Sequence, residues 1–316
     1  MRHLLSIEDL EREDIERILG SAAFFAEVAD RPIKKVPSFR GRLVINLFYE
    51  ASTRTRSSFE LAAKRLSADV LNVVSSGSSV EKGESLQDTV ATLSAYGPDA
   101  IVIRSPSAGT PALVAGWTDA GVVNAGDGKH QHPTQALLDV YVLSRRLGDI
   151  EGRRIWIVGD VLHSRVARSC AQAFRKLGAE VTFAGPPTLV PGALTALGCE
   201  VRHTLEGIGE ADVIYALRLQ HERMSDAFLP SLGEYAANYQ INSRRLGPRQ
   251  LLMHPGPVNR GVELSGEVID GPQSLIVEQV RAGIVVRMAV LVEVLAGSHS
   301  DDSAVAPITT AEPQLA

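Results

Sequence analysis

A run of phosphate-type donors, Ser52-Thr53-Arg54-Thr55-Arg56, stands between an apolar segment and a stretch with helical spacing. The start of a helix offers unpaired backbone N–H groups and the positive end of the helix dipole, and both attract anions. Hydroxyls and a guanidinium fork add donors that suit phosphate oxygens. The alternative is a simple helix cap with solvated arginines. Consecutive donors at a strand–turn–helix junction favour a phosphate site.

Arginines also follow other predicted strands. Arg104 ends the strand 99–104, Arg165 follows the strand 153–160, and Arg218 ends the strand 212–218, with Gln220 just beyond it. Ligands of parallel α/β sheets bind beyond the carboxyl ends of the strands, although each arginine alone is compatible with an ordinary surface position. Together the cations predict a cleft that holds a phosphate on one wall and carboxylates on the other.

A histidine precedes the predicted helix 133–147. His132, with Gln135 one turn later, follows the glycine-rich segment NAGDGK. A histidine at a helix start can present a ring nitrogen to a substrate carbonyl, and a buried structural histidine is the alternative. His130 and His132 lack matching carboxylates, so a metal site is not predicted.

Two loops and a failed motif complete the candidates. The polar loop 75–85 carries Lys82, and by its residues alone it is an ordinary solvated loop.

The turn 254–257, HPGP, is rigid because proline fixes φ. It can contain a cis bond and aim bare carbonyls at a ligand amine, and a plain turn is the alternative. The segment GDVLHS lacks the later glycines of GxGxxG, which argues against a nicotinamide site.

The elements that must position these residues alternate between strand and helix. Apolar strands at 43–50, 68–74, 99–104 and, after a restart, 153–160, 179–186, 200–203, 212–218 and 250–255 are separated by amphipathic helices. This order predicts the α/β class, as two doubly wound parallel-sheet α/β domains joined by interdomain helices. A helix is also expected over 189–197, and residues 298–316 are expected to be a disordered tail.

Composition excludes several classes of protein. The 316 residues are 45% hydrophobic and 22% charged with a net charge of -5, so the chain as a whole does not attract nucleic acid or an anionic membrane. No apolar run reaches the ~18 residues of a membrane span, and the acidic N-terminal region does not resemble a signal peptide. A cytoplasmic location is therefore expected. Cys170 and Cys199 are predicted to be buried thiols.

Taken together, STRTR at 52–56, Arg104 at a strand end, HPTQ at 132–135 and the HPxP turn at 254–257 resemble the transcarbamylase family. The resemblance runs from about residue 3 to 297. The ornithine branch typically has an HCLP motif and an SMG motif, whereas this chain has HPGP and no SMG. RLQ at 218–220 and GDVLHSR ending at Arg165 are similar to the aspartate branch. Two arginines in the second half also match the two carboxylates of L-aspartate better than an ornithine side chain.

The resemblance implies carbamoyl transfer from carbamoyl phosphate to L-aspartate, an early step of pyrimidine synthesis, without cofactor or metal. It implies a carbamoyl-phosphate-binding domain at 1–134, on which the helix 274–297 packs back, and an aspartate-binding domain at 135–273. The implied catalytic residues are Arg54, Thr55, Lys82, Arg104 and His132. The implied carbamoyl-phosphate-binding residues are Ser52, Thr53, Arg54, Thr55, Ser78, Arg104, His132 and Gln135. The implied aspartate-binding residues are Lys82, Arg165, Arg218, Gln220, Gly256 and Pro257.

The resemblance also implies a homotrimer whose subunits share active sites, because Ser78 and Lys82 resemble residues lent to a neighbouring subunit; Ser79 is an alternative register for Ser78. Association with a regulatory chain or a dihydroorotase stays open. Gly256 departs from the enteric enzymes, which carry leucine between the two prolines. Transfer to a different amine and a non-catalytic scaffold are the rival functions; the scaffold is disfavoured because a retired site has no physical reason to keep clustered cations.

Overall fold

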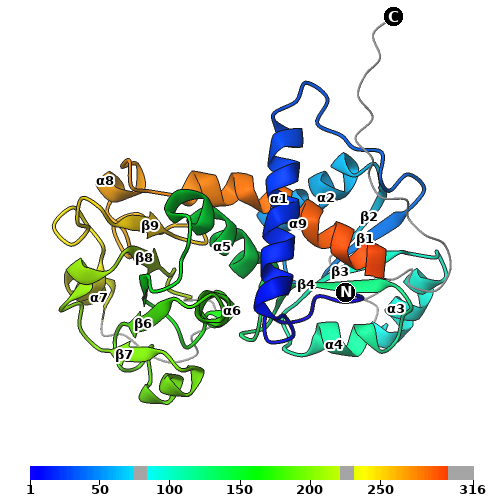
Figure 1. Cartoon of the computed structure of the whole chain (residues 1–316). Coiled ribbons are helices and arrows are strands. Elements are labelled where there is room, and N and C mark those ends of the chain that lie inside the picture. The colour runs from blue at the N-terminus through cyan, green and yellow to red at the C-terminus, as the bar shows by residue number, and fades with distance from the viewer. Residues whose placement is uncertain (75–83, 221–230, 298–316) are drawn as a thin grey trace, which may run out of the picture.

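The computed structural model describes residues 1–74, 84–220 and 231–297, and the chain folds around two parallel β-sheets (Figure 1). The first sheet has the strand order β2-β1-β3-β4. Its strands are β1 (Leu43–Phe48), β2 (Asp69–Val74), β3 (Ala100–Ser105) and β4 (Gly121–Asp127). Strands β1, β3 and β4 are buried almost throughout, as continuous apolar runs predict for a sheet covered on both faces.

Helices cover both faces of this first sheet. They are α1 (Arg12–Ala29), α2 (Thr53–Arg65), α3 (Leu86–Ser94), α4 (Thr110–Ala115) and α9 (Ile276–Gly297). Successive strand residues point to opposite faces, so Ile45 packs with apolar residues of α3 and α4, whereas Val44 packs in the larger core with α2 and α9. The last helix of the chain therefore returns to the first sheet.

The second sheet has the order β7-β6-β5-β8-β9, again with every pair parallel. Its strands are β5 (Arg154–Val158), β6 (Glu180–Ala184), β7 (Glu200–Arg202), β8 (Val213–Ala216) and β9 (Leu251–Met253). Helices α5 (Pro133–Leu147) and α6 (Arg165–Lys176) pack on one face. The opposite face packs against segments that include the 3-10 helix η3 (Ile208–Glu210) and α8 (Gly266–Ile269).

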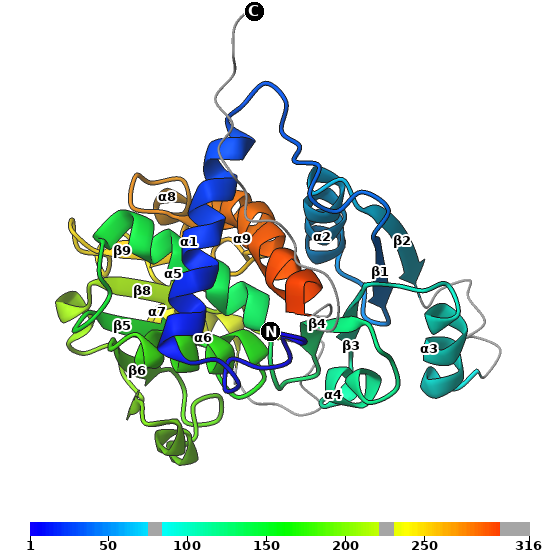
Figure 2. The ribbon, with the colours of Figure 1, turned by 45° about the vertical axis from the view of Figure 1, so that its right-hand side comes forward.

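Helices join the two halves. Figure 2 shows α1, α5 and α9 between the sheets, and α9 contacts both α1 and α5. The predicted fold class, two parallel-sheet α/β domains, is confirmed. None of the helices in the described ranges is long and apolar enough to cross a membrane, although α9 is largely apolar.

Three local expectations differ from the structure. The polar segment after β1 is not a separate turn, since α2 already begins at Thr53. The segment expected as a helix over 189–197 contains the 3-10 helix η2 (Gly192–Leu197), bounded by Pro191 and by Gly198 at φ 70°. Short helices α4 and α8, and α7 (Leu232–Tyr239), were not expected, because 4 to 8 residues carry too little periodic pattern. Both cysteines are buried and free, as predicted.

Candidate active site

The two sheets bring their arginines to the same kind of place. Strand order reverses between β1 and β3 in the first sheet and between β5 and β8 in the second. A crevice opens beyond the strand ends at such a switch point, and ligands bind there. Arg54 and Arg104 lie at the first switch point, and Arg165 and Arg218 lie at the second.

One pocket of about 660 Å³ joins both switch points. Its walls come from segments that follow β1, β4, β5, β8 and β9, together with the end of β3 and one side of α9. The structure brings together in this pocket every predicted site residue that it describes, namely Ser52, Thr53, Arg54, Thr55, Arg104, His132, Gln135, Arg165, Arg218, Gln220, Gly256 and Pro257.

The N-terminus of α2 forms the first wall. Ser52 is the N-cap, and its Oγ accepts from the Thr55 amide at 3.4 Å and donates to Thr55 Oγ1 at 3.0 Å. The first turn contains no acidic side chain. The positive end of the helix and its free N–H groups therefore face the pocket with no carboxylate in the first turn of the helix itself.

Arg54 faces a cation from the other half of the molecule. Burial, and then the nearby Arg218, lower the pKa of the Arg54 guanidinium, which stays charged at neutral pH. The turn after β9 contacts it as well, because a β-carbon on Gly256, whose φ is +65°, would overlap Arg54 Nη1. The Gly256–Pro257 bond is cis. Glycine at 256 thus permits the turn to approach the phosphate-type donors closely.

A carboxylate that sequence reasoning missed holds two of the arginines. Glu50 accepts from Arg104 Nη2 at 2.6 Å, from Arg165 Nη1 at 3.0 Å and also from Arg165 Nη2. Arg104 also donates to the Ala125 carbonyl at 3.0 Å. The ion pairs join the first sheet to the start of α6. An acidic residue directly after an apolar strand and before STRTR was the available signal.

A glycine lies against the same two guanidiniums. Gly126 has φ +117°, and a β-carbon there would lie 3.0 Å from Arg104 Nη1 and 3.0 Å from Arg165 Cζ. L-residues rarely adopt this φ. Both the backbone conformation and the space therefore require glycine where Arg104 and Arg165 meet.

His132 is a neutral donor in a cationic surrounding. Burial first, and then the charges of Arg104, Arg165 and Arg287, lower the pKa of its imidazole well below the usual value. Its amide donates to Ser169 Oγ at 2.9 Å, and its Nδ1 has no hydrogen-bond partner among the described residues. A neutral imidazole has one N–H donor, so His132 can donate to a substrate oxygen without releasing a proton.

Gln135 lies one turn further along α5. Its Nε2 donates to both oxygens of Asp139, at 3.1 and 3.2 Å. The amide oxygen Oε1 is left as the atom able to accept from a ligand N–H.

The second wall carries the groups predicted to bind carboxylates. Arg218 Nη2 donates to Gln220 Oε1 at 3.3 Å, and the backbone N–H of Gln220 donates to the buried Asp160 carboxylate at 3.2 Å. Arg165 also donates to the Gly128 carbonyl at 3.2 Å. The loops after β5 and β8 are thus fixed to each other, and both present guanidiniums.

The long helix α9 adds an arginine that the sequence did not indicate. Arg287 is buried, donates to Ser58 Oγ at 2.9 Å and lies 5.1 Å from the centroid of the Phe59 ring. Burial lowers the pKa of its guanidinium to about 10, and it stays charged at neutral pH. No motif marked Arg287, because it stands in an apolar helix far along the chain from the other site residues.

Ser78 and Lys82, and the alternative Ser79, lie outside the described residues.

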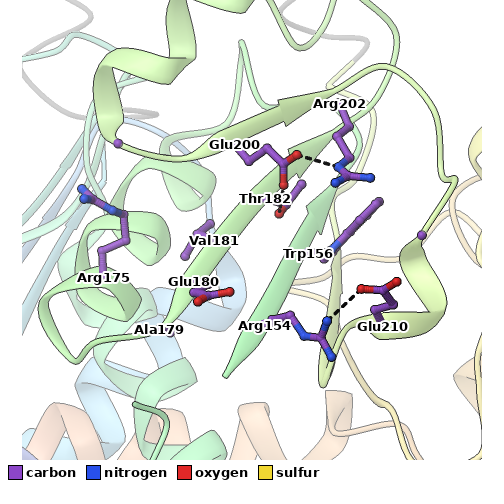
Figure 3. A pocket seen from close by; sticks show the side chains of 12 residues that line it. Arg154, Trp156, Arg175, Ala179, Glu180, Val181, Thr182, Glu200, Arg202 and Glu210 are labelled. Atoms are coloured by element: carbon purple, nitrogen blue, oxygen red, sulfur yellow. Dashed lines mark hydrogen bonds and ion pairs between the residues drawn. The ribbon is translucent and has the colours of Figure 1, made fainter. Parts of the chain in front are cut away.

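A second pocket provides a contrast. It has a volume of about 460 Å³ and lies over one edge of the second sheet, beside Trp156. Figure 3 shows carboxylates and guanidiniums alternating around it, with ion pairs Arg154–Glu210 and Arg202–Glu200, both at 2.8 Å. Its three arginines face three glutamates, the remaining ones being Arg175 and Glu180. This pocket has no surplus of positive charge.

Comparison with known sequences identifies the family. Residues 2–145 match the sequence model of the aspartate/ornithine carbamoyltransferase carbamoyl-P binding domain, and residues 151–294 match that of the Asp/Orn binding domain. The chain belongs to the aspartate/ornithine carbamoyltransferase family. The predicted membership is thereby confirmed.

Relatives within this carbamoyltransferase family agree. The chain is 55% identical to an aspartate carbamoyltransferase catalytic subunit of Acidothermus cellulolyticus, over 95% of this chain and 94% of the relative. It is 53% identical to that of Salinispora arenicola, over 95% and 99%.

Solved structures of the family agree as well. The catalytic subunit of M. jannaschii aspartate transcarbamoylase matches with a TM-score of 0.82 and 36% identity, over 95% of this chain and all of that one. A Trypanosoma cruzi aspartate transcarbamoylase in complex with N-(phosphonacetyl)-L-aspartic acid matches with a TM-score of 0.82 and 31% identity, over 92% and 94%. The same T. cruzi enzyme is also known in complex with carbamoyl phosphate and aspartate.

Proposed function

We propose that the chain transfers the carbamoyl group of carbamoyl phosphate to the amine of L-aspartate, giving N-carbamoyl-L-aspartate and phosphate, an early step of pyrimidine synthesis. The observation that carries the proposal is a single pocket in whose described lining the guanidiniums of both halves outnumber the one carboxylate, Glu50. Such a pocket suits two anionic substrates side by side. The T. cruzi relative, which is known with this pair of substrates, supports the same reaction.

Phosphate binding falls to the first wall. Ser52, Thr53, Arg54 and Thr55 form the cradle, where backbone N–H groups, hydroxyls and a guanidinium donate to the phosphate oxygens. Arg104 spans the phosphate and the carbonyl oxygen. Arg54 and Arg104 offset the negative charge that phosphate gains on leaving.

The carbamoyl group is read by a second set of donors and acceptors. Thr55, Arg104 and His132 donate to its carbonyl oxygen. Gln135 accepts from its NH2 group, as do the carbonyls of Pro255 and Gly256 in the turn after β9. A neutral His132 suits this task, because the carbonyl oxygen needs a donor that keeps its proton.

L-Aspartate occupies the second wall. Arg165 and Arg218 bind its two carboxylates, with Gln220 beside them and with Gly256 and Pro257 lining the approach. Guanidinium forks match carboxylates in a bidentate way. Glu50 accepts from both Nη atoms of Arg165 and so fixes the direction of this fork.

Chemistry then follows from positioning. The deprotonated amine of aspartate attacks the carbonyl carbon, and negative charge builds on the oxygen that Thr55, Arg104 and His132 face. The C–O bond to phosphate breaks as the C–N bond is completed. Phosphate leaves with the bonding electrons and accepts the proton that the amine loses. The step needs no covalent enzyme intermediate and no cofactor.

We further propose a homotrimer in which Ser78 and Lys82 of one subunit complete the site of the next. The exposed edge of the first sheet supports a partner there, since Leu71 on β2 and Leu61 on α2 are 37% and 39% exposed. Light scattering should give three times the chain mass of 33.9 kDa. A monomer with full activity would contradict shared sites.

The proposed domains are residues 1–134 with α9 packed on them, and residues 135–273. The contacts of α9 with α1 and α2 support the return of this helix to the first domain. A cytoplasmic location stays a prediction that cell fractionation would test. A regulatory chain or a dihydroorotase as partner stays open, and co-purification at native concentration would answer that question.

The decisive assay supplies purified protein with carbamoyl phosphate and one amine at a time. N-Carbamoyl-L-aspartate should form, and citrulline should not form from ornithine. Preference for ornithine, or for another amine, would replace the proposed acceptor while leaving the family unchanged.

A further inference from the structure

A fully buried carboxylate lies directly behind the pocket. Asp139, on α5, is 0% exposed. It accepts from the side chains of Gln135 at 3.1 and 3.2 Å, Gln279 at 2.7 Å, Tyr215 at 2.7 Å and Cys170 at 3.3 Å. Its donors come from α5, α9, β8 and α6, so one side chain connects four elements of the two halves.

The carboxylate fixes which way the Gln135 amide points. An ionised carboxylate only accepts hydrogen bonds, so the Gln135 atom next to Asp139 must be the donor Nε2. The acceptor Oε1 is then the end left for the pocket. A neutral amide in place of Asp139 would remove this constraint, because it can pair with either end of Gln135.

A second connection runs from Asp139 to the turn after β9. Gln279 donates through Nε2 to Asp139 and accepts through Oε1 from the His254 amide at 3.0 Å. His254 Nδ1 in turn accepts from the Gly256 amide at 2.8 Å. The orientation of Gln279 is set by the same acceptor-only carboxylate. The backbone carbonyls of the turn are thereby held in place.

We propose that Asp139 is a positioning residue for the reaction, because it orients the acceptors that bind the carbamoyl NH2 group. It orients Gln135 directly. It orients the turn at Gly256 indirectly, through Gln279 and His254. This inference rests on the proposed function, since it assigns a task to those acceptors. Asp139 touches no substrate, so its effect is on the alignment of the carbonyl carbon with the attacking amine and not on phosphate binding.

The charge of Asp139 is open to titration near neutral pH. Burial raises the pKa of its carboxyl to about 6, against the hydrogen bonds from Gln279, Tyr215, Cys170 and Gln135, which favour the ionised form. The charged group facing it from α9 is Arg287. Below this pH the carboxyl carries a proton and becomes a donor, so the constraint on both glutamines is lost. Turnover should therefore fall through this group as the pH drops below about 6.

The test compares wild type with Asp139→Asn, using three probes on each. Carbamoyl phosphate carries the NH2 group, whereas inorganic phosphate and N-(phosphonacetyl)-L-aspartate lack it. In the variant we expect kcat to fall about 10²-fold, the size of losing one well-aligned polar contact at the transition state. The inhibition constants of the other two probes should change less than about 3-fold. The acidic limb near pH 6 should disappear from its kcat profile.

A control and a second variant keep the test decisive. Asp212→Asn alters a carboxylate that accepts from the Arg154 amide at 2.9 Å, at the other end of the second sheet, and should leave kcat unchanged. Gln279→Met keeps the side-chain size but cuts the connection to the turn. It should lower kcat about 10-fold with an unchanged phosphate inhibition constant, and it decides the question if Asp139→Asn does not fold.

Two outcomes overturn the inference. One is wild-type kcat in the folded Asp139→Asn or Gln279→Met variant, and the other is an equal loss of affinity for all three probes, which would mark a purely structural role. A wild-type protein that transfers no carbamoyl group to any amine would instead contradict the proposed function, and the inference with it.

Discussion

The pocket between the sheets and the pocket beside Trp156 use the same residue types in opposite ways. Beside Trp156, three arginines face three glutamates, and the ion pairs Arg154–Glu210 and Arg202–Glu200 join exposed side chains. In the pocket between the sheets, five arginines face Glu50 as the one acidic residue of its described lining. Exposed ion pairs contribute only about 0 to 1 kcal/mol each, whereas clustered, partly buried cations repel one another and lack full hydration.

The difference shows that a binding site for anions requires other groups to hold its like charges together. The cationic pocket is held by Glu50, by the backbone carbonyls of Ala125 and Gly128 and by packing on Phe59. Among the described residues of the lining the arginines outnumber the one carboxylate, so the pocket suits an anionic ligand. In the pocket beside Trp156, called the balanced pocket below, equal numbers of arginines and glutamates line the wall, so no anionic ligand is needed to offset their charge.

The largest expected effect is at the cradle. Arg54→Ala removes a guanidinium from the phosphate wall, and we expect kcat to fall about 10²- to 10³-fold, as for the loss of a transition-state donor. The fold should persist, which thermal unfolding and circular dichroism would check. Near-normal turnover by the folded variant would break the comparison, because the surplus charge would then have no role.

Glu50→Gln is expected to have the second largest effect on the kinetics. It removes the carboxylate that aligns Arg104 and Arg165, and breaking a buried ion pair by removing one partner costs several kcal/mol. We expect kcat/KM for aspartate to fall about 10²-fold, since each 1.4 kcal/mol is tenfold. Glu200→Gln, in the balanced pocket, is the matched control. Equal kinetics of the two variants would mean that ion pairing in the two pockets is equivalent.

The burial of His132, together with the charges of the nearby arginines, should also be visible in the pH dependence of stability. The pKa of His132 is lowered in the fold, so below pH 6.5 the unfolded chain binds a proton that the folded chain does not. The contribution of His132 to the free energy of unfolding is therefore complete above pH 6.5. It is lost as the pH falls below this value, by up to about 1.4 kcal/mol per pH unit.

Denaturant titrations of wild type and His132→Gln between pH 7.5 and 5.5 would measure the difference. The variant should lose less stability over this range than wild type. Parallel curves would show that neither burial nor the neighbouring arginines lower the pKa of His132.

The smallest effect is expected in the balanced pocket. Arg202→Ala removes one exposed ion pair and the contact with Trp156, at 5.3 Å from the ring centroid. Stability should change by less than about 1 kcal/mol, and kcat/KM should stay within error. A several-fold kinetic effect would show that the two pockets communicate.

Much of the site was predictable because its residues stand at recognisable positions in the sequence, namely after apolar strands or at the start of a helix. STRTR, Arg104, Arg165 and Arg218 follow apolar strands, and parallel strands bring their carboxyl ends to one edge. His132 and Gln135 open a helix that begins with proline. Each of these signals is local, so a single sequence carries it. Their roles toward substrate stay predictions for the proposed experiments.

Other residues of the site carry a weak local signal or none. Glu50 is a lone acidic residue, Arg287 interrupts an apolar helix, and Asp139 lies on the buried side of α5. What distinguishes them is their partners, which are distant in the chain: Glu50 meets Arg165, and Asp139 meets Gln279. No periodicity or motif encodes a pairing of this kind.

The sequence by itself determined the alternation of strands and helices, the family and, for the described residues, the wall of the pocket on which the predicted donors lie, because apolar runs and turn residues act over a few positions. Only the tertiary structure decided that the two switch points open into one pocket, that Glu50 bridges two arginines and that a buried carboxylate orients the acceptors behind it. The physical reason is range: burial and charge pairing depend on what lies within a few ångströms in space, and long-range packing sets those neighbours.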